Sequence, residues 1–140
     1  ISRCSNNYGP NQDKTKLIPK FISLLLQNKK VPLYAKGENI RDWIYVEDHI
    51  DAIDMLFHKG KSGGIYNIGG NYELSNMEIV KKLTAITKKD ESYIEYVSDR
   101  LGHDFRYAID NSEIYKEFGW KPKYSFEEGI SKTFKYIENK

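Results

Sequence analysis

The first twelve residues, Ile1–Gln12, read ISRCSNNYGPNQ and predict a β-strand that ends in two adjacent asparagines. A Tyr-Gly-Pro sequence follows them, which is typical of a turn. Ligands of open α/β sheets bind beyond the carboxyl ends of the strands, where Asn6 and Asn7 would lie. Side-chain amides at that place can hydrogen-bond a carboxamide, a sugar hydroxyl or a phosphate. Ordinary turn chemistry is the alternative interpretation of the same pair.

The overall composition predicts a single soluble domain. The chain has 140 residues, and its 22 basic and 20 acidic residues leave a net charge of +2, which predicts no nucleic-acid partner. Cys4, the only cysteine, excludes an intrachain disulfide and favours a reducing cytoplasm. The longest apolar stretch, Leu17–Leu26, contains Pro19 and Lys20, so we expect an amphipathic helix and no membrane span.

Helical and extended patterns alternate along the chain, which predicts an α/β fold. In the helix expected between Glu47 and Gly60, Val46, Ile50, Ile53 and Phe57 repeat at helical spacing and predict an apolar face. We expect the face that includes Ile53 to lack part of the surface it normally packs against. The other expected elements are helices from Leu17, after Ser75, between Asp110 and Gly119 and after Ser125, strands at 31–35, 63–70 and 92–97, and a polar loop at 36–43. The strands are few and short for a sheet that stands alone, so we expect further strands upstream.

Two of the expected helices begin with the Ser-x-x-Glu pattern of a capping box, Ser75–Glu78 and Ser125–Glu128. Asn76 lies just inside the first box and is a candidate ligand contact. The alternative is that it is a neutral residue at a helix start.

Two loops carry arginines in patterns that suit phosphate binding. In the segment 37–43, Arg41 stands beside Asp42, and we expect the carboxylate to orient the guanidinium for a bidentate contact. An exposed ion pair of little energetic value is the alternative. In the segment 99–106, Arg100 and His103 flank a glycine and are expected to hold a diphosphate from the opposite side, or else to form a solvated loop.

Other catalytic patterns are absent from the sequence. We find no glycine-rich dinucleotide turn, no metal-ligand spacing and no Ser/His/Asp arrangement. Tyr136 and Lys140 have Tyr-x-x-x-Lys spacing, which we interpret as chance because the pair ends the terminal helix. His49, inside a helix, and His58, at a helix end, are interpreted as ordinary helix residues.

The motifs SNNYGP, TKLIP, VPLYAKGENIRDWIYVEDH, YNIGG and DRLGHDFRYAID, in this order, resemble the C-terminal portion of the dTDP-glucose 4,6-dehydratase family. These enzymes are extended short-chain dehydrogenases/reductases, and the resemblance covers essentially the whole chain. IRDWIYVEDH and DRLGHDFRYAID are specific, whereas YGP and YNIGG recur in related epimerases and decarboxylases. The resemblance implies a Rossmann-type fold, with residues 1–14 ending the NAD-binding portion and residues 15–140 forming the sugar-nucleotide portion, including segments that can cross back to the Rossmann sheet.

The resemblance also implies an activity, the NAD-dependent conversion of dTDP-glucose to dTDP-4-keto-6-deoxyglucose. In this family NAD oxidises C4, water leaves across C5 and C6, and the hydride returns to C6. Asn7 would contact NAD, and the implied substrate contacts are Asn6, Lys16, Leu17, Pro32, Leu33, Tyr34, Arg41, Asn76, Arg100 and His103.

The family's glycine-rich turn, Asp-Glu pair and catalytic Tyr-x-x-x-Lys all precede SNNYGP, so we expect no catalytic residue within 1–140 and no activity of this chain alone. The complete enzyme is expected to be a cytoplasmic homodimer that binds NAD mainly through its N-terminal portion. A related epimerase or UDP-glucuronate decarboxylase, and a truncated nucleotide-binding remnant that is not an enzyme, are the alternatives.

Overall fold

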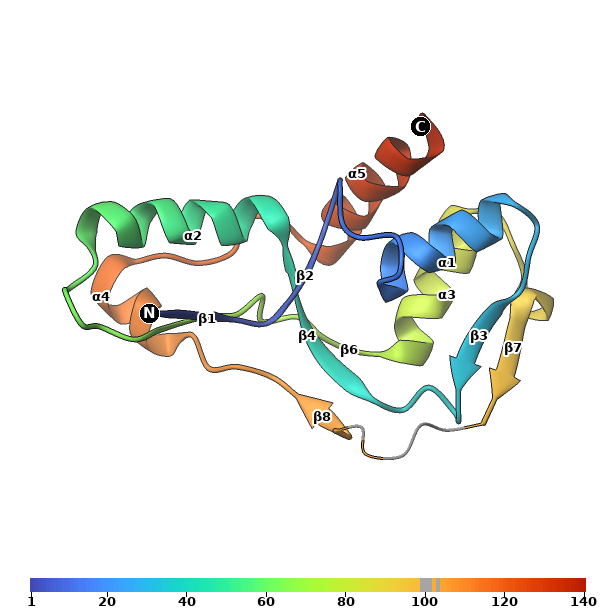
Figure 1. Ribbon diagram of the computed structural model, residues 1–140, viewed down its shortest axis with the longest axis horizontal. Helices are drawn as coiled ribbons and strands as arrows, with labels where there is room; N and C mark the ends of the chain where they lie inside the picture. The colour runs from blue at the N-terminus through green and yellow to red at the C-terminus, as the bar shows by residue number, and fades with distance from the viewer. Residues whose placement is uncertain (99–101, 103) are drawn as a thin grey trace.

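The computed structural model describes residues 1–98, 102 and 104–140, whose short strands form three separate sheets (Figure 1). The described strands are β1 (Ser2–Cys4), β2 (Asn6–Tyr8), β3 (Val31–Tyr34), β4 (Ile40–Tyr45), β5 (Tyr66–Ile68), β6 (Glu73–Ser75), β7 (Ile94–Val97) and β8 (Arg106–Tyr107). β1 pairs in parallel with β5, and β3 pairs in parallel with β7. β4 pairs in parallel with β2 and β8 and antiparallel with β6.

The helices confirm the α/β prediction. The described α-helices are α1 (Leu17–Leu26), α2 (Val46–Lys59), α3 (Asn76–Ile86), α4 (Ser112–Phe118) and α5 (Phe126–Glu138), with a 3-10 turn, η1, at Glu91–Tyr93. Figure 1 shows α2 and α4 at one end of the molecule and α1, α3, β3 and β7 at the other, with β2 and β4 running between them. Within the described ranges, no helix has the length and apolar character needed to cross a bilayer.

Both predicted capping boxes are present. Ser75 Oγ accepts a hydrogen bond from the Glu78 main-chain N–H at 3.2 Å, and Glu78 Oε2 accepts from the Ser75 N–H at 2.7 Å. Ser125 and Glu128 repeat the arrangement at the start of α5. A capping box needs only contacts three residues apart, so it depends little on the rest of the fold.

The chain passes from one ladder to another at Ser5. The Ser5 N–H donates to the Ile68 carbonyl at 3.0 Å, continuing the β1–β5 ladder, whereas Asn6 is already paired with Trp43 of β4. The single opening strand expected from the sequence is therefore two strands. Asn6 and Asn7, predicted at the end of one opening strand, instead begin the second strand, β2, because β1 and β2 have different partners.

β4 begins at Ile40, inside the segment predicted as a polar loop. Its first residues pair with Ser75 of β6 and with Arg106 of β8, both far away in the sequence. A local sequence pattern does not indicate partners that lie so far away in the chain. The polar character of the segment therefore predicts a loop where the structure has a strand. Because this segment is a strand and not a loop, its alternate side chains point to opposite faces.

Two apolar cores lie on the two faces of the β2–β4 pair. The larger core contains Tyr8, Trp43, Tyr45 and Phe126 together with the buried sides of α1 and α3. The smaller core contains Ile44, Ala52, Ile68, Ile114 and Trp120. Neighbouring residues of β4 therefore serve different cores.

The apolar face predicted for α2 is largely exposed, and a different side of the helix packs into the smaller core. Ile50 is 59% and Phe57 84% exposed, while Ala52 is fully buried. Asp48, Ala52 and Leu56 follow one another at four-residue intervals and share a face, and Ala52 and Leu56 pack into the smaller core. The helix is oriented by its buried carboxylate, which the apolar pattern did not take into account.

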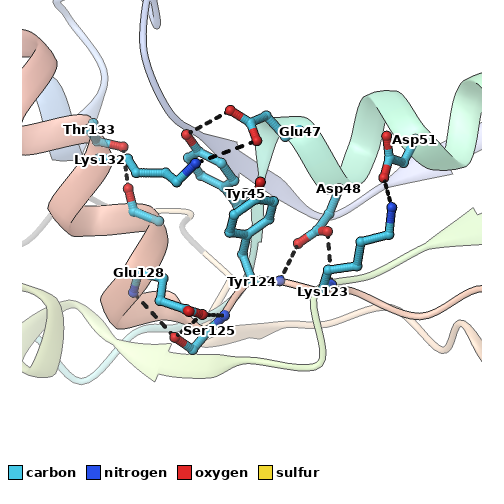
Figure 2. Close-up of polar contacts among 11 residues, drawn as sticks. Tyr45, Glu47, Asp48, Asp51, Lys123, Tyr124, Ser125, Glu128, Lys132 and Thr133 are labelled. Atoms are coloured by element: carbon cyan, nitrogen blue, oxygen red, sulfur yellow. Dashed lines mark hydrogen bonds and ion pairs between the residues drawn. The ribbon is translucent and has the colours of Figure 1, made fainter.

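A polar cluster fixes the start of α2 against the segment before α5 (Figure 2). The Asp48 carboxylate is 1% exposed and accepts hydrogen bonds from the main-chain N–H groups of Lys123 at 2.9 Å and Tyr124 at 3.2 Å. Tyr45 packs edge-on to Tyr124, with 4.9 Å between ring centroids. Burial, helped by the Glu47 carboxylate, raises the pKa of Tyr45 to about 12, so its hydroxyl stays protonated and donates to Glu47 Oε1 at 3.4 Å.

Candidate functional site

A pocket of about 490 Å³ lies where β2, the following loop, β4 and the starts of α1 and α3 meet. The residues that line it are Asn6, Asn7, Gln12, Lys16, Leu17, Arg41, Trp43 and Asn76. Of these, all except Gln12 and Trp43 were singled out from the sequence. The fold thus brings together predicted site residues that are separated in the sequence by up to half the length of the chain.

The strand register explains why three of these side chains share the pocket. Asn6 of β2 is the Cα partner of Trp43 in the parallel β2–β4 ladder. Arg41 and Trp43 are two residues apart on β4, so their side chains point to the same face. Asn6, Arg41 and Trp43 consequently form one continuous wall.

Arg41 is held by main-chain oxygens. Its Nη1 donates to the Ile40 carbonyl at 2.7 Å and its Nη2 donates to the Asp104 carbonyl at 2.9 Å. Carbonyl groups orient a guanidinium without neutralising it, so the charge of Arg41 is retained for an anion in the pocket.

Asp42 does not orient Arg41, contrary to the prediction. It is 1% exposed and faces the other side of β4, where its carboxylate accepts from the N–H groups of Gly70 at 3.0 Å and Tyr72 at 2.8 Å. A Cβ on Gly70 would lie 1.7 Å from the Trp43 carbonyl oxygen, so this close approach requires glycine. The Gly-Gly pair that follows β5 therefore allows close backbone packing next to the pocket.

Asn7 is engaged within the chain. Its Nδ2 donates to Cys4 Sγ at 3.3 Å and to the Ser5 carbonyl at 3.1 Å, which leaves Oδ1 facing His49 Nδ1 at 2.8 Å. Because Oδ1 can only accept, His49 must carry its proton on Nδ1. Burial lowers the pKa of the His49 imidazole, which favours its neutral form, and the contact with Asn7 Oδ1 selects the Nδ1–H tautomer.

The interpretation of His49 as an ordinary helix residue is corrected by this contact. The hydrogen bond joins α2 to β2 across 42 positions of sequence, and no local signal indicates it. The bond holds the Asn7 amide at the point where the chain changes ladders.

The loop between β2 and α1 folds back over the pocket. Gln12 Nε2 donates to the Asn7 carbonyl at 2.8 Å. Asp13 Oδ1 accepts from Thr15 Oγ1 at 2.6 Å and from the Thr15 N–H at 2.7 Å, and these bonds lower the pKa of Asp13. This turn places Lys16 next to the pocket, immediately before α1. The Lys16 side chain is exposed there.

Other predicted site residues lie elsewhere. Pro32, Leu33 and Tyr34 are on β3 and do not line this pocket. Leu33 is 2% exposed and belongs to the larger core. Arg100 and His103 lie outside the described residues.

A larger hollow, of about 760 Å³, lies between the β2–α1 loop, α1 and the end of α5. It contains none of the site residues predicted from the sequence. Tyr136 and Lys140 are on its wall, where Lys140 Nζ donates to the Tyr136 hydroxyl at 3.0 Å. Lysines and amides also line this hollow, together with the Asp13 carboxylate, so neither size nor these groups alone select the site. The smaller pocket is favoured because it gathers the predicted site residues and its described lining has no carboxylate.

The parallel strand pairs fit a Rossmann-type α/β protein, and the likeness to solved dTDP-glucose 4,6-dehydratases places the chain in the extended short-chain dehydrogenase/reductase class. The family model for GDP-mannose 4,6 dehydratase matches residues 1–133, and the chain belongs to this family.

Individual relatives confirm the resemblance noted in the sequence motifs. A dTDP-glucose 4,6-dehydratase from Escherichia coli is 49% identical over 147 residues, which cover 99% of this chain and 41% of that protein. The crystal structure of the Bacillus anthracis dTDP-glucose 4,6-dehydratase in complex with NAD is 48% identical, with a TM-score of 0.94, over 99% of this chain and 44% of that one. UDP-glucose 4-epimerase from Thermotoga maritima, solved with UDP-glucose, is 30% identical with a TM-score of 0.92, over 99% of this chain and 45% of that one. The chain spans about two fifths of the length of the curated relatives it matches.

Proposed function

We propose that this chain forms the sugar-nucleotide-binding part of a dTDP-glucose 4,6-dehydratase, an NAD-dependent lyase. The observation that carries the proposal is the chemistry of the 490 Å³ pocket. Its described lining combines two cations, Lys16 and Arg41, with the amides of Asn6 and Asn76 and contains no carboxylate. Cations suit a diphosphate, and amides suit sugar hydroxyls.

Each residue has a distinct task in this proposal. Arg41, oriented by two carbonyls, binds the diphosphate, and Lys16 adds a second positive charge at the mouth. Asn6 and Asn76 hydrogen-bond the sugar. Pro32, Leu33 and Tyr34 of β3 are proposed for the nucleoside end of the substrate and Arg100 and His103 for the diphosphate, on the family resemblance alone.

NAD, when bound, supplies the hydride acceptor and donor for the reaction. Asn7 fits a contact with its carboxamide only through Oδ1, because both N–H groups of Nδ2 are used within the chain and His49 occupies one lone pair of Oδ1. The second lone pair is available to a donor. No catalytic group is assigned within residues 1–140.

The same proposal assigns residues 1–14 to the end of the NAD-binding portion and residues 15–140 to the substrate portion. The parallel pairing of β1 with β5 and of β2 with β4 supports this, since Rossmann sheets are built from parallel strands and these pairs return later segments to that sheet. The exposed Ile50 and Phe57 of α2 provide an apolar face for further packing. A homodimer in the cytoplasm is proposed on the family resemblance alone.

Calorimetric titration of the chain with dTDP, dTDP-glucose and UDP-glucose tests the proposal. We expect dTDP and dTDP-glucose to bind and UDP-glucose to bind more weakly. Preference for UDP-glucose would favour the epimerase alternative, which rests on the structural likeness to the Thermotoga maritima enzyme. Binding of none of the three would refute a sugar-nucleotide site.

A further inference from the structure

Two residues that line the pocket each carry a buried polar atom without a hydrogen-bond partner among the described residues, Gln12 Oε1 and Trp43 Nε1. Gln12 also lines the larger hollow. Neither residue was a candidate from the sequence. Unpaired polar atoms are rare in folded proteins because burial removes their bonds to water without replacement. Of the four such side-chain atoms among the described residues, these two belong to residues that line the same pocket, where a ligand could complete their hydrogen bonding.

Trp43 supplies a fixed donor. The residue is 5% exposed, and its ring packs edge-on to Tyr8, with 6.3 Å between centroids and 76° between planes. Trp43 is also the Cα partner of Asn6, so its ring stands beside a residue already proposed to bind the sugar. An indole N–H can only donate, so its partner must be an acceptor.

Gln12 supplies an adjustable acceptor. Its Nε2 donates to the Asn7 carbonyl at 2.8 Å, and this bond identifies Oε1 as the unpaired atom. The terminal torsion of glutamine has a broad energy profile, so a small rotation of the amide can turn Oε1 toward a ligand. Its partner must be a donor, which excludes an ionised phosphate.

A hydroxyl group is the ligand chemistry that satisfies both atoms, because a hydroxyl both donates and accepts. Hexose rings carry several hydroxyls, and the cations of the same pocket account separately for a diphosphate. We propose that Gln12 Oε1 and Trp43 Nε1 hydrogen-bond hydroxyl groups of the hexose in the bound sugar nucleotide. This proposal rests on the proposed function and names two further residues that contact the substrate.

Trp120 provides a matched control within the same chain. Its Nε1 is also buried and unpaired among the described residues, but it lies in the smaller core with Ile44 and Ile114. Trp43 and Trp120 are the only two tryptophans in the sequence. A Trp120→Phe variant therefore assigns both indole N–H resonances in a ¹⁵N-labelled sample.

The first measurement follows these two resonances during titration with dTDP and with dTDP-glucose. We expect dTDP-glucose to shift the Trp43 indole proton downfield, as a new hydrogen bond does, and to leave Trp120 in place. Titration with dTDP alone should not produce the downfield shift. An equal shift with dTDP would show that the indole meets the nucleotide and would overturn the hexose assignment.

The second measurement compares affinities by calorimetry in Trp43→Phe and Gln12→Met, which remove the polar atoms while keeping most of the volume. Each should weaken dTDP-glucose roughly two- to tenfold, the range for one neutral hydrogen bond, and leave dTDP unchanged. Trp120→Phe and Gln27→Met should change neither affinity. Unchanged dTDP-glucose affinity in both pocket variants would overturn this inference alone, whereas a wild-type chain that binds neither ligand would overturn the proposed function. If Trp43→Phe or Gln12→Met fails to fold, the resonance measurement on the wild-type chain, assigned with Trp120→Phe, still decides.

Discussion

Arg41 and Asp42 are neighbours that serve opposite faces of β4. Asp42 accepts from the main-chain N–H groups of Gly70 and Tyr72 at 3.0 and 2.8 Å, whereas the Arg41 guanidinium donates to the carbonyls of Ile40 and Asp104 at 2.7 and 2.9 Å. The alternation of a β-strand causes this division. Substitutions at the two positions should consequently have different effects, one on ligand binding and the other on stability.

Replacing Arg41 with alanine should weaken dTDP binding by about 1.5–3 kcal/mol, the range for hydrogen bonds to a charged group. Lysine at this position should restore only part of the loss, because it cannot form the bidentate fork. Calorimetric titration with dTDP measures both. Arg106→Ala is the matched control, since Arg106 pairs with Glu73 at 2.6 Å outside the pocket. An unchanged dissociation constant in Arg41→Ala would remove Arg41 from the site.

Replacing Asp42 with alanine should lower the free energy of unfolding by about 1.5–3 kcal/mol, because two main-chain N–H groups lose a charged acceptor in a buried setting. Urea denaturation followed by circular dichroism measures this change. Asp51→Ala is the control, as its carboxylate pairs with Lys123 on the surface and should contribute little to the free energy of unfolding. Equal effects of the two substitutions would contradict the structural role of Asp42.

Asp48 should make stability depend on pH in a recognisable direction. Burial raises the pKa of this carboxyl above 3.8, and its bonds from Lys123 and Tyr124 only partly oppose the shift. The folded state therefore holds the proton more tightly than the unfolded state. The contribution of Asp48 to the free energy of unfolding should fall as pH rises from about 3.8 through the raised pKa, and it should be constant above that pKa.

Urea denaturation of wild type and Asp48→Asn across this pH range isolates the effect. The difference in unfolding free energy, wild type minus variant, should decrease as pH rises. Asp13→Asn is a control of opposite sign, because side-chain and main-chain hydrogen bonds from Thr15 lower the pKa of Asp13 and its contribution appears as pH rises. A difference for Asp48 that increases with pH would contradict the assignment.

The bond between His49 and Asn7 should survive protonation of the imidazole, because Nδ1 carries a proton in both states. Nitrogen-15 shifts of the ring should show the Nδ1–H tautomer at pH 7. Burial lowers the pKa of His49, so the folded state should lose stability as pH falls through 6.5 toward the lowered value. A dominant Nε2–H tautomer at pH 7 would contradict the orientation of the Asn7 amide. His58, on the surface and paired with Asp54, serves as the reference signal.

The sequence predicted those features that depend on neighbours a few residues away. The capping boxes at Ser75 and Ser125 were predicted correctly because each partner lies three positions along the same helix. The side of α2 that packs inward could not be identified from the sequence, because the Asp48 carboxylate on that side accepts from the N–H of Lys123, 75 positions away. Gln12 and Trp43 gave no signal in the sequence, since their significance depends on atoms left unpaired by the folded chain.

Residues 1–140 should show no dehydratase activity when incubated with dTDP-glucose and NAD. The pocket supplies cations and amides, but its described lining has no carboxylate or tyrosine to move a proton, and Asn7 offers the cofactor only one lone pair. The 4-keto sugar product gives a chromophore in alkali, which measures turnover directly, with the Escherichia coli enzyme as the positive control. Turnover clearly above a blank without protein would require a proton-transfer group within this chain. Tyr136 with Lys140, in the larger hollow, would then be the first pair to replace, because it has the Tyr-x-x-x-Lys spacing and its hydroxyl already accepts from Lys140 Nζ at 3.0 Å.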